Sequence, residues 1–359
     1  MAVRDQVTCR LRMRAWSALG ALLGALLASG SPAHAAGFRV VGYAASWGTD
    51  IAALQYSKLT HVLWSFAAPQ DDGSLTGVDV AKLSKLATTA HAAKVKVFLA
   101  VGGGGNGDKG WQACTATDAG RQALVKACIA AVHANDLDGI DFDWEYPDGA
   151  QVAGYNAAVK LLAAALHAEG KEISAAVTKT DWPHSFPTKE LYDGVAPGFD
   201  FLNIMVYDDP APHSTVKAAQ AGLDTWLKTK GLAKEKTVLG CPFYGSANGG
   251  VAYKTIVAQD PAAAWVDKDG AEDYNSIPTM KKKTEMALAQ AGGIMFWELS
   301  QDAVGGLSLL SAVHDVIIAK GTSGILSIRV PAAAARPRAS DALGRALLPL
   351  PHAMEAIFR

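Results

Sequence analysis

Short apolar runs alternate with longer amphipathic stretches from residue 39 to residue 319. Most of the runs are continuous rather than interrupted by polar residues, which is typical of parallel strands buried on both faces. The predicted strands cover residues 39–47, 61–67, 95–102, 139–146, 172–179, 201–208, 237–244 and 293–299. The predicted helices cover residues 79–93, 117–135, 151–169, 214–229, 279–291 and 307–319.

This alternation predicts an α/β fold. Strands separated by helices over a stretch of this length favour a single (β/α)8 barrel, or TIM barrel. An open, doubly wound parallel sheet is the alternative architecture. It has less support, because no Gly-x-Gly-x-x-Gly sequence follows the first predicted strand.

The amino-terminal end of the chain differs from this middle part. Three arginines between residues 10 and 14 precede an apolar run over residues 15–28, and small residues follow up to Ala35. This order is typical of a secretory signal peptide, so we expect residues 1–35 to be removed and the protein to be secreted, to the cell exterior or the periplasm. A membrane anchor is the alternative, but a span needs about 20 apolar residues, more than this run or any later one contains.

The carboxy-terminal residues 321–359 are rich in alanine, proline and arginine and have no sustained periodicity. This composition predicts a disordered basic tail, which is either an inert extension or a weak anchor to an anionic cell surface. The barrel is then expected to span residues 36–320 as one domain.

The formal net charge of −1 for 359 residues hides an uneven distribution. Basic residues exceed acidic ones by three in residues 1–36 and again in residues 321–359, so the middle carries 24 basic and 31 acidic side chains. Nucleic-acid binding requires that phosphates be neutralised, so an acidic body argues against a nucleic-acid partner. A neutral or cationic partner fits better.

Cysteine and histidine usage does not indicate a metal site. Cys9 lies in the predicted signal peptide, which leaves Cys114, Cys128 and Cys241. Cys114 and Cys128 either pair in an oxidising compartment or remain free thiols. No Cys-x-x-Cys or His-Glu-x-x-His spacing occurs and the nine histidines are scattered, so we expect neither a metal nor a cofactor.

Acidic residues break the apolar pattern in the fourth predicted strand, where Asp141, Asp143 and Glu145 occupy every second position. Successive side chains of a strand point to opposite faces, so the three carboxylates share one face, and Phe142 and Trp144 point toward the helices. Burying three acids inside a barrel is costly, which favours a functional role over a stabilising one. A solvated acidic edge strand is the alternative.

Neighbouring carboxylates raise one another's pKa, which keeps one acid protonated near neutral pH. Glu145, nearest the open end of the strand, is the predicted general acid, and Asp143 would steer and stabilise a group beside it. No second acid is obviously placed across the cleft. This argues against the ordinary two-carboxylate glycosidase scheme and for a nucleophile supplied by the substrate.

The sequence Asp138-x-x-Asp141-x-Asp143-x-Glu145 resembles the DxxDxDxE signature of glycoside hydrolase family 18, the chitinase family. Three further segments resemble motifs of that family in the same order along the chain. They are M-x-Y-D at 205–208, G-x-P-F-Y-G at 240–245 and the segment with a substrate-stacking tryptophan at 296–298. The resemblance covers most of residues 38–319.

The resemblance implies a TIM barrel that hydrolyses β-1,4-linked N-acetylglucosamine polymers (chitin) with retention, through an oxazolinium ion formed by the substrate's own acetamido group. It implies that Glu145 protonates the glycosidic oxygen and that Asp143 orients the acetamido N–H. Tyr207 would donate to the acetamido carbonyl, and Asp141 would share a proton with Asp143. No cofactor is implied. The expected partners are chitin or N-acetylglucosamine oligosaccharides, and we expect a monomer.

Substrate contacts are predicted for Asp208 and Met205 and for three aromatic residues at strand ends, Trp297, Tyr43 and Phe66. The alternative for the aromatic residues is the barrel core, and a strand-end cap is the alternative for Tyr207 and Asp208. Three other tryptophans are candidates for outer subsites or for loop packing: Trp47, Trp111 and Trp182.

Two features depart from the family pattern. The family often has Ser-x-Gly-Gly after the third strand, where this chain has Ala100-Val-Gly-Gly, so the protonation of Asp141 is expected to be tuned differently. Only about fifty residues separate Tyr244 from Ile294, too few for the insertion domain that deepens the cleft in many members. The alternatives are an endo-β-N-acetylglucosaminidase acting on N-glycans, or a non-catalytic chitin-binding lectin, although lectin relatives usually lack the last acid.

Overall fold

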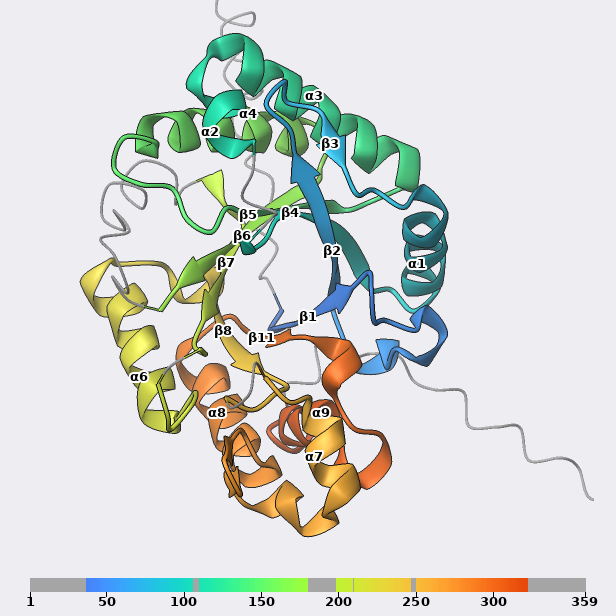
Figure 1. The fold of residues 1–359 in the computed structure, drawn as a ribbon, viewed down its shortest axis with the longest axis vertical. Coiled ribbons are helices and arrows are strands. Elements are labelled where there is room, and N and C mark those ends of the chain that lie inside the picture. The colour runs from blue at the N-terminus through green and yellow to red at the C-terminus, as the bar shows by residue number, and fades with distance from the viewer. Residues whose placement is uncertain (1–36, 106–109, 180–197, 209, 247–249, 322–359) are drawn as a thin grey trace, which may run out of the picture.

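A computed structural model describes residues 37–105, 110–179, 198–208, 210–246 and 250–321 (Figure 1). Parallel strands form a closed ring, because β1 pairs with β2 on one side and with β11 on the other. The ring consists of β1 (Arg39–Ala45), β2 (His61–Pro69), β4 (Lys96–Gly102), β5 (Gly139–Asp143), β6 (Glu172–Thr178), β7 (Phe201–Met205), β8 (Thr237–Pro242) and β11 (Gly293–Trp297). The predicted (β/α)8 barrel is therefore confirmed.

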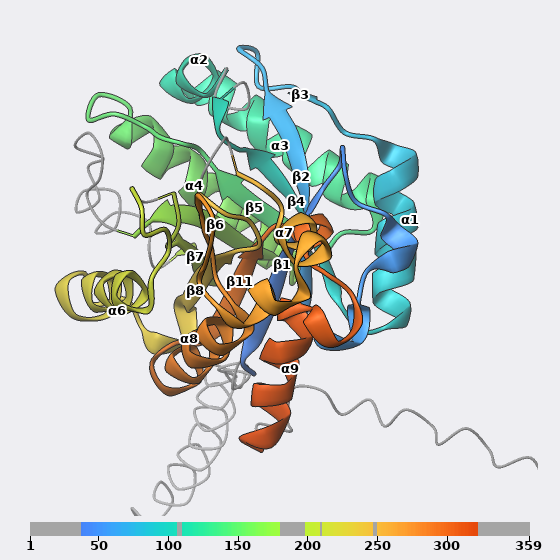
Figure 2. The same ribbon diagram turned by 60° about the horizontal axis from the view of Figure 1, so that its bottom comes forward.

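Helices surround the ring from outside, as Figure 1 and the turned view in Figure 2 show. They are α1 (Val80–Ala92), α2 (Trp111–Ala116), α3 (Asp118–Asn135), α4 (Val152–Ala168), α6 (Val216–Asp224), α7 (Tyr253–Gln259), α8 (Ile277–Gln290) and α9 (Leu309–Ala319). Side-chain caps begin several of them: Asp79 accepts from the Lys82 N–H at α1, and Thr117 accepts from the Gly120 N–H at α3. No helix in these ranges has the length and hydropathy to cross a bilayer.

The predicted bounds need corrections of three kinds. β1, β8 and β11 each end two residues before the predicted end, at Ala45, Pro242 and Trp297. β5 ends at Asp143 and β7 at Met205, so Glu145, Tyr207 and Asp208 lie just beyond their strands rather than on them. The predicted helix 214–229 is α6 followed by a five-residue π-helical turn. The short elements α2, α7, β3 (Leu75–Thr76), β9 (Lys268–Asp269) and β10 (Glu272–Asp273) were not predicted, because each is too short for a periodic pattern.

The main core lies between the strands and the helices. Phe142 and Trp144 point into it from β5 and the residue after it, as predicted, and Trp111 packs on both, with ring centroids 4.4 and 5.3 Å away. Trp111 is wholly buried, so of its two expected roles it has the packing one, and it lines no subsite. Trp182, the predicted signal peptide and residues 322–359 of the predicted tail lie outside the described residues.

The cysteines of the described ranges are free and buried, so Cys114 and Cys128 do not pair. Burial raises the pKa of the Cys114 thiol to about 11 and that of Cys128 to about 12. Both therefore remain protonated and pack as small apolar side chains.

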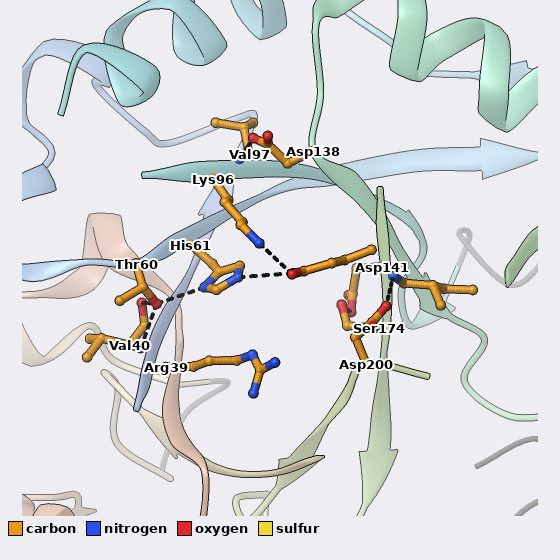
Figure 3. A network of polar contacts seen from close by, with 12 residues as sticks. Arg39, Val40, Thr60, His61, Lys96, Val97, Asp138, Asp141, Ser174 and Asp200 are labelled. Atoms are coloured by element: carbon orange, nitrogen blue, oxygen red, sulfur yellow. Dashed lines mark hydrogen bonds and ion pairs between the residues drawn. The ribbon is translucent and has the colours of Figure 1, made fainter. Parts of the chain in front are cut away.

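Charged side chains close the amino-terminal end of the barrel (Figure 3). His61 begins β2, where its Nδ1 lies 2.7 Å from the Thr60 hydroxyl and its Nε2 lies 3.5 Å from a carboxylate oxygen of Glu172. Lys96 also pairs with Glu172, and the Arg39 guanidinium lies 4.8 Å from the centre of the Phe201 ring. This polar floor leaves the opposite, carboxyl end of the strands for the chemistry of the barrel.

Candidate active site

A cavity of about 600 Å³ lies at the carboxyl ends of the strands. Every residue predicted to bind or transform the substrate lines it, except Asp141. The predicted residues that line it are Tyr43, Trp47, Phe66, Asp143, Glu145, Met205, Tyr207, Asp208 and Trp297. One site thus brings together side chains from segments that are far apart in the sequence.

The acidic row rises from the barrel interior to the cavity. Asp141 is wholly buried, Asp143 is 3% exposed and Glu145, beyond the end of β5, is half-buried. Exposure thus increases along the row toward Glu145, the residue predicted to lie nearest the open end. Glu145 is the acid of this row that a ligand in the cavity reaches most readily.

Asp141 is surrounded by hydrogen-bond donors. The Tyr43 hydroxyl donates to Oδ2 at 2.6 Å, the Ser174 hydroxyl donates to Oδ1 at 2.6 Å, and the Asn203 amide donates to Oδ1 at 3.3 Å. Burial raises the pKa of Asp141 to about 6, although these three donors act to lower it. A carboxyl with such a pKa exchanges its proton in the range where many enzymes work.

Two phenol groups lie near the acidic row, and one of them, that of Tyr207, lines the cavity. Burial raises the pKa of Tyr207 and of Tyr244, with nearby carboxylates adding to the effect, so both hydroxyls remain proton donors at all ordinary pH values. Tyr244 donates to Asp208 Oδ1 at 2.5 Å, and the centroids of the two tyrosine rings are 6.3 Å apart. Asp208 is exposed and adopts a left-handed backbone conformation with φ of +59°, which is uncommon for a residue other than glycine.

Aromatic rings form the apolar side of the cavity. Trp297 stacks on Phe66, with centroids 5.5 Å apart and planes inclined by 22°, and meets the Tyr43 ring edge-on at 5.4 Å. Trp47 continues this surface 6.4 Å from Trp297 and is 67% exposed. Trp47, Phe66 and Trp297 together thus give the cavity a continuous aromatic surface, part of which solvent reaches.

Gly102, which ends β4, and Gly103, which follows it, allow the main chain to lie close to the Asp143 carbonyl and to the Phe66 ring. A Cβ atom on Gly102 would lie 1.9 Å from the Asp143 carbonyl oxygen, and one on Gly103 would lie 2.6 Å from the Phe66 ring. Both residues also have positive φ. These glycines thus let the end of β4 pack closely against Asp143 and Phe66.

Several residues of the site were not predicted. Tyr146, Thr178 and Lys179 line the cavity, and Ser174 and Asn203 hold Asp141 from below. Ser174 and Asn203 are polar residues inside otherwise apolar strand sequences, which was the available signal. Within the described ranges, no group of three or more His, Cys, Asp and Glu side chains is arranged to hold a metal ion.

Comparison with known proteins identifies a family. The family model described as "Glycosyl hydrolases family 18" matches residues 39–302. A "chitinase-like effector" of Moniliophthora roreri is 30% identical over 257 residues, which cover 62% of each chain. A "Probable endochitinase" of Caenorhabditis elegans is 30% identical over 225 residues, which cover 52% of this chain and 36% of that protein. The chain thus spans less than two thirds of the length of these relatives.

Solved structures share the barrel. The GH18 chitinase ChiB from the chitin utilization locus of Flavobacterium johnsoniae is 29% identical and superposes with a TM-score of 0.69, covering 78% of this chain and 94% of that one. A chitinase-like agglutinin from Robinia pseudoacacia superposes with a TM-score of 0.68 at 22% identity, covering 77% and 98%. The agglutinin supports the fold alone.

Proposed function

Because the chain belongs to glycosyl hydrolase family 18, we propose that it is a chitinase that hydrolyses β-1,4-linked N-acetylglucosamine polymers. The observation that carries the proposal is the acidic row, with Glu145 facing the cavity above Asp143 and Asp141. Relatives named as chitinases support the same activity.

In the first step, Glu145 gives its proton to the glycosidic oxygen while the bond between that oxygen and the anomeric carbon breaks. The acetamido carbonyl oxygen of the same sugar attacks the anomeric carbon and forms an oxazolinium ion. Asp143 accepts the acetamido N–H, and the Tyr207 hydroxyl donates to the carbonyl oxygen that becomes the nucleophile. Donors and acceptors fixed in place before the reaction stabilise the charge that develops on the acetamido group.

In the second step, Glu145 acts as a base. Its carboxylate takes a proton from a water molecule, whose oxygen attacks the anomeric carbon and opens the oxazolinium ring. Two displacements at the same carbon restore the β configuration, so the reaction proceeds with retention. The acid is also regenerated for the next turnover.

The substrate would lie with the face of one sugar on Trp297 and a neighbouring sugar near Trp47. Phe66 stacks on the Trp297 ring, while Met205 and Asp208, which also line the cavity, would provide an apolar and a polar contact. Stacking on aromatic rings suits the apolar faces of pyranose rings. The sequence pattern at residues 10–35 further leads us to propose that the protein is secreted, and we propose that it acts as a monomer.

One digestion separates this proposal from its alternatives. The purified protein is incubated with N-acetylated chitin oligomers beside a denatured high-mannose glycoprotein, and the products are identified by mass spectrometry. A chitinase shortens the oligomers. Release of the glycan alone would indicate an endo-β-N-acetylglucosaminidase, and binding without any cleavage would indicate a lectin.

A further inference from the structure

Asp141 has a different neighbour on each adjacent strand. In the register of the barrel it lies opposite Ala100 of β4 and opposite Ser174 of β6. Both neighbours are wholly buried, and Ala100 belongs to the same interior cluster as Tyr43. The side chain of Asp141 thus lies between a methyl group and a hydroxyl group.

The hydroxyl group that donates to Asp141 comes from Ser174 of β6, and not from β4. Position 100 is where the family pattern leads to the expectation of a serine, and alanine has no donor to offer. Ser174 provides one from the other neighbouring strand, with its Oγ 2.6 Å from Asp141 Oδ1. The remaining donor to that oxygen, the Asn203 amide, is 3.3 Å away, beyond the usual length of a strong hydrogen bond.

A buried carboxylate needs donors in order to stay ionised. In the mechanism that the family resemblance implies, an ionised Asp141 accepts the proton of Asp143, and the other oxygen of Asp143 is left for the acetamido N–H of the substrate. If Asp141 is itself protonated, it no longer accepts that proton, and Asp143 is free to turn away from the substrate. The state of Asp141 therefore decides how Asp143 is presented to the substrate.

We propose that Ser174 is a positioning residue of this enzyme, which holds Asp141 as the acceptor of the Asp143 proton and replaces, from β6, the hydroxyl that Ala100 does not provide. This inference rests on the proposed function for its effect on turnover. The contact between Ser174 and Asp141 is independent of that function. The contact and its effect on turnover are therefore measured in separate experiments.

The first measurement is the titration of Asp141 by carbon NMR of labelled protein, with its carboxyl resonance identified as the one that Asp141→Asn removes. Ser174→Ala should raise the midpoint by about one pH unit, because a lost hydrogen bond to a charged acceptor has roughly that effect on a pKa. An unchanged midpoint would overturn the proposal, whether or not the protein cleaves chitin.

The second measurement is the pH profile of turnover with N-acetylated oligomers. Ser174→Ala should move the acidic limb of kcat upward by about one unit, which is roughly a tenfold loss of rate below the limb, with little change in KM. Ala100→Ser combined with Ser174→Ala restores a hydroxyl beside Asp141 and should return the limb toward its wild-type position. A limb that stays in place while the Asp141 titration moves would refute the positioning role.

Ser308→Ala is the matched control. Ser308 is also buried and donates at 2.7 Å to a buried carboxylate, Asp302, but neither residue lines the cavity. This variant should lose stability and keep the pH profile of the wild type. Thermal midpoints of all variants separate a folding defect from a titration effect. If Ser174→Ala does not fold, Ser174→Cys, which replaces the hydroxyl with a much weaker donor of similar shape, should shift the Asp141 midpoint in the same direction. A wild-type protein without turnover would refute the proposed function and leave the titration as the test of the contact.

Discussion

Lys283 is a buried charge whose removal should damage the wall of the site that carries Tyr207 and Asp208. The side chain is wholly buried on α8, and burial lowers its pKa. Its Nζ donates to the Ser214 carbonyl at 2.5 Å, to the Ser214 hydroxyl at 2.8 Å and to Asn275 Oδ1 at 2.6 Å. The Ser214 hydroxyl in turn donates to the carbonyl of Val206, the residue before Tyr207.

Lys283→Met keeps most of the volume and removes all three donors. The Ser214 carbonyl keeps a second donor, the Asn275 amide at 3.0 Å, while no other hydrogen bond to Asn275 Oδ1 is described. An unsatisfied buried acceptor costs about 1–3 kcal/mol, and each weakened contact at Ser214 adds about 0.5–1 kcal/mol. The relief of a buried charge offsets part of this sum. We expect the free energy of unfolding to fall by about 2–4 kcal/mol.

Denaturant unfolding followed by fluorescence measures this loss, and oligomer turnover measures its effect on the site. Displacement of Tyr207 and Asp208 should lower kcat/KM by roughly tenfold, because small shifts of positioning groups are costly. Lys282→Met is the control, since Lys282 is an exposed lysine on the same helix and its loss should change stability by less than about 0.5 kcal/mol. A Lys283→Met variant as stable as the control would refute the reasoning.

Two further predictions concern the acid and the barrel floor. Glu145→Gln should lower kcat by about 10²–10⁴-fold without changing the thermal midpoint or the oligomer Kd, because glutamine has the shape of the acid but no proton to give; a near wild-type rate would assign the acid elsewhere. Burial raises the pKa of Glu172, but its contacts with His61 and Lys96 outweigh burial and bring it from 4.5 to about 2. Because its pKa is lower in the folded protein than in the unfolded chain, the Glu172 carboxylate contributes its full stabilisation above pH 4.5, and this contribution is lost as the pH falls toward 2. Glu172→Gln should therefore flatten the acid-unfolding curve in that range by at most about 3 kcal/mol. Equal slopes for the two proteins would contradict this.

The barrel could be predicted because each of its strands has a recognisable pattern within its own segment of the sequence. Continuous apolar runs identify strands buried on both faces, and the two-residue period places Asp141 and Asp143 on one face without knowledge of any neighbour. Strand ends were less predictable, since Glu145 and Tyr207 follow the strand pattern while their main chain has already left the sheet.

Contacts between strands were beyond prediction. The hydrogen bond from Ser174 to Asp141 depends on the register of β5 and β6, which no single strand reveals. Trp111 shows the same limit: its position after a glycine run is compatible with a subsite, but its packing on Phe142 depends on where α2 lies. The local sequence thus indicates whether a side chain is buried, but only the assembled barrel shows which side chain it contacts.

The measurement that tests the central claim most directly compares two substrates that differ only in the acetamido group. Wild-type protein is incubated with N-acetylated tri- to hexasaccharides of β-1,4-linked glucosamine and, separately, with their fully deacetylated counterparts, and Glu145→Gln serves as the inactive reference. If the substrate supplies the nucleophile, the acetylated series is cleaved and the deacetylated series is left intact. Equal rates on the two series would contradict the account, because the deacetylated sugar has no carbonyl oxygen with which to attack its own anomeric carbon.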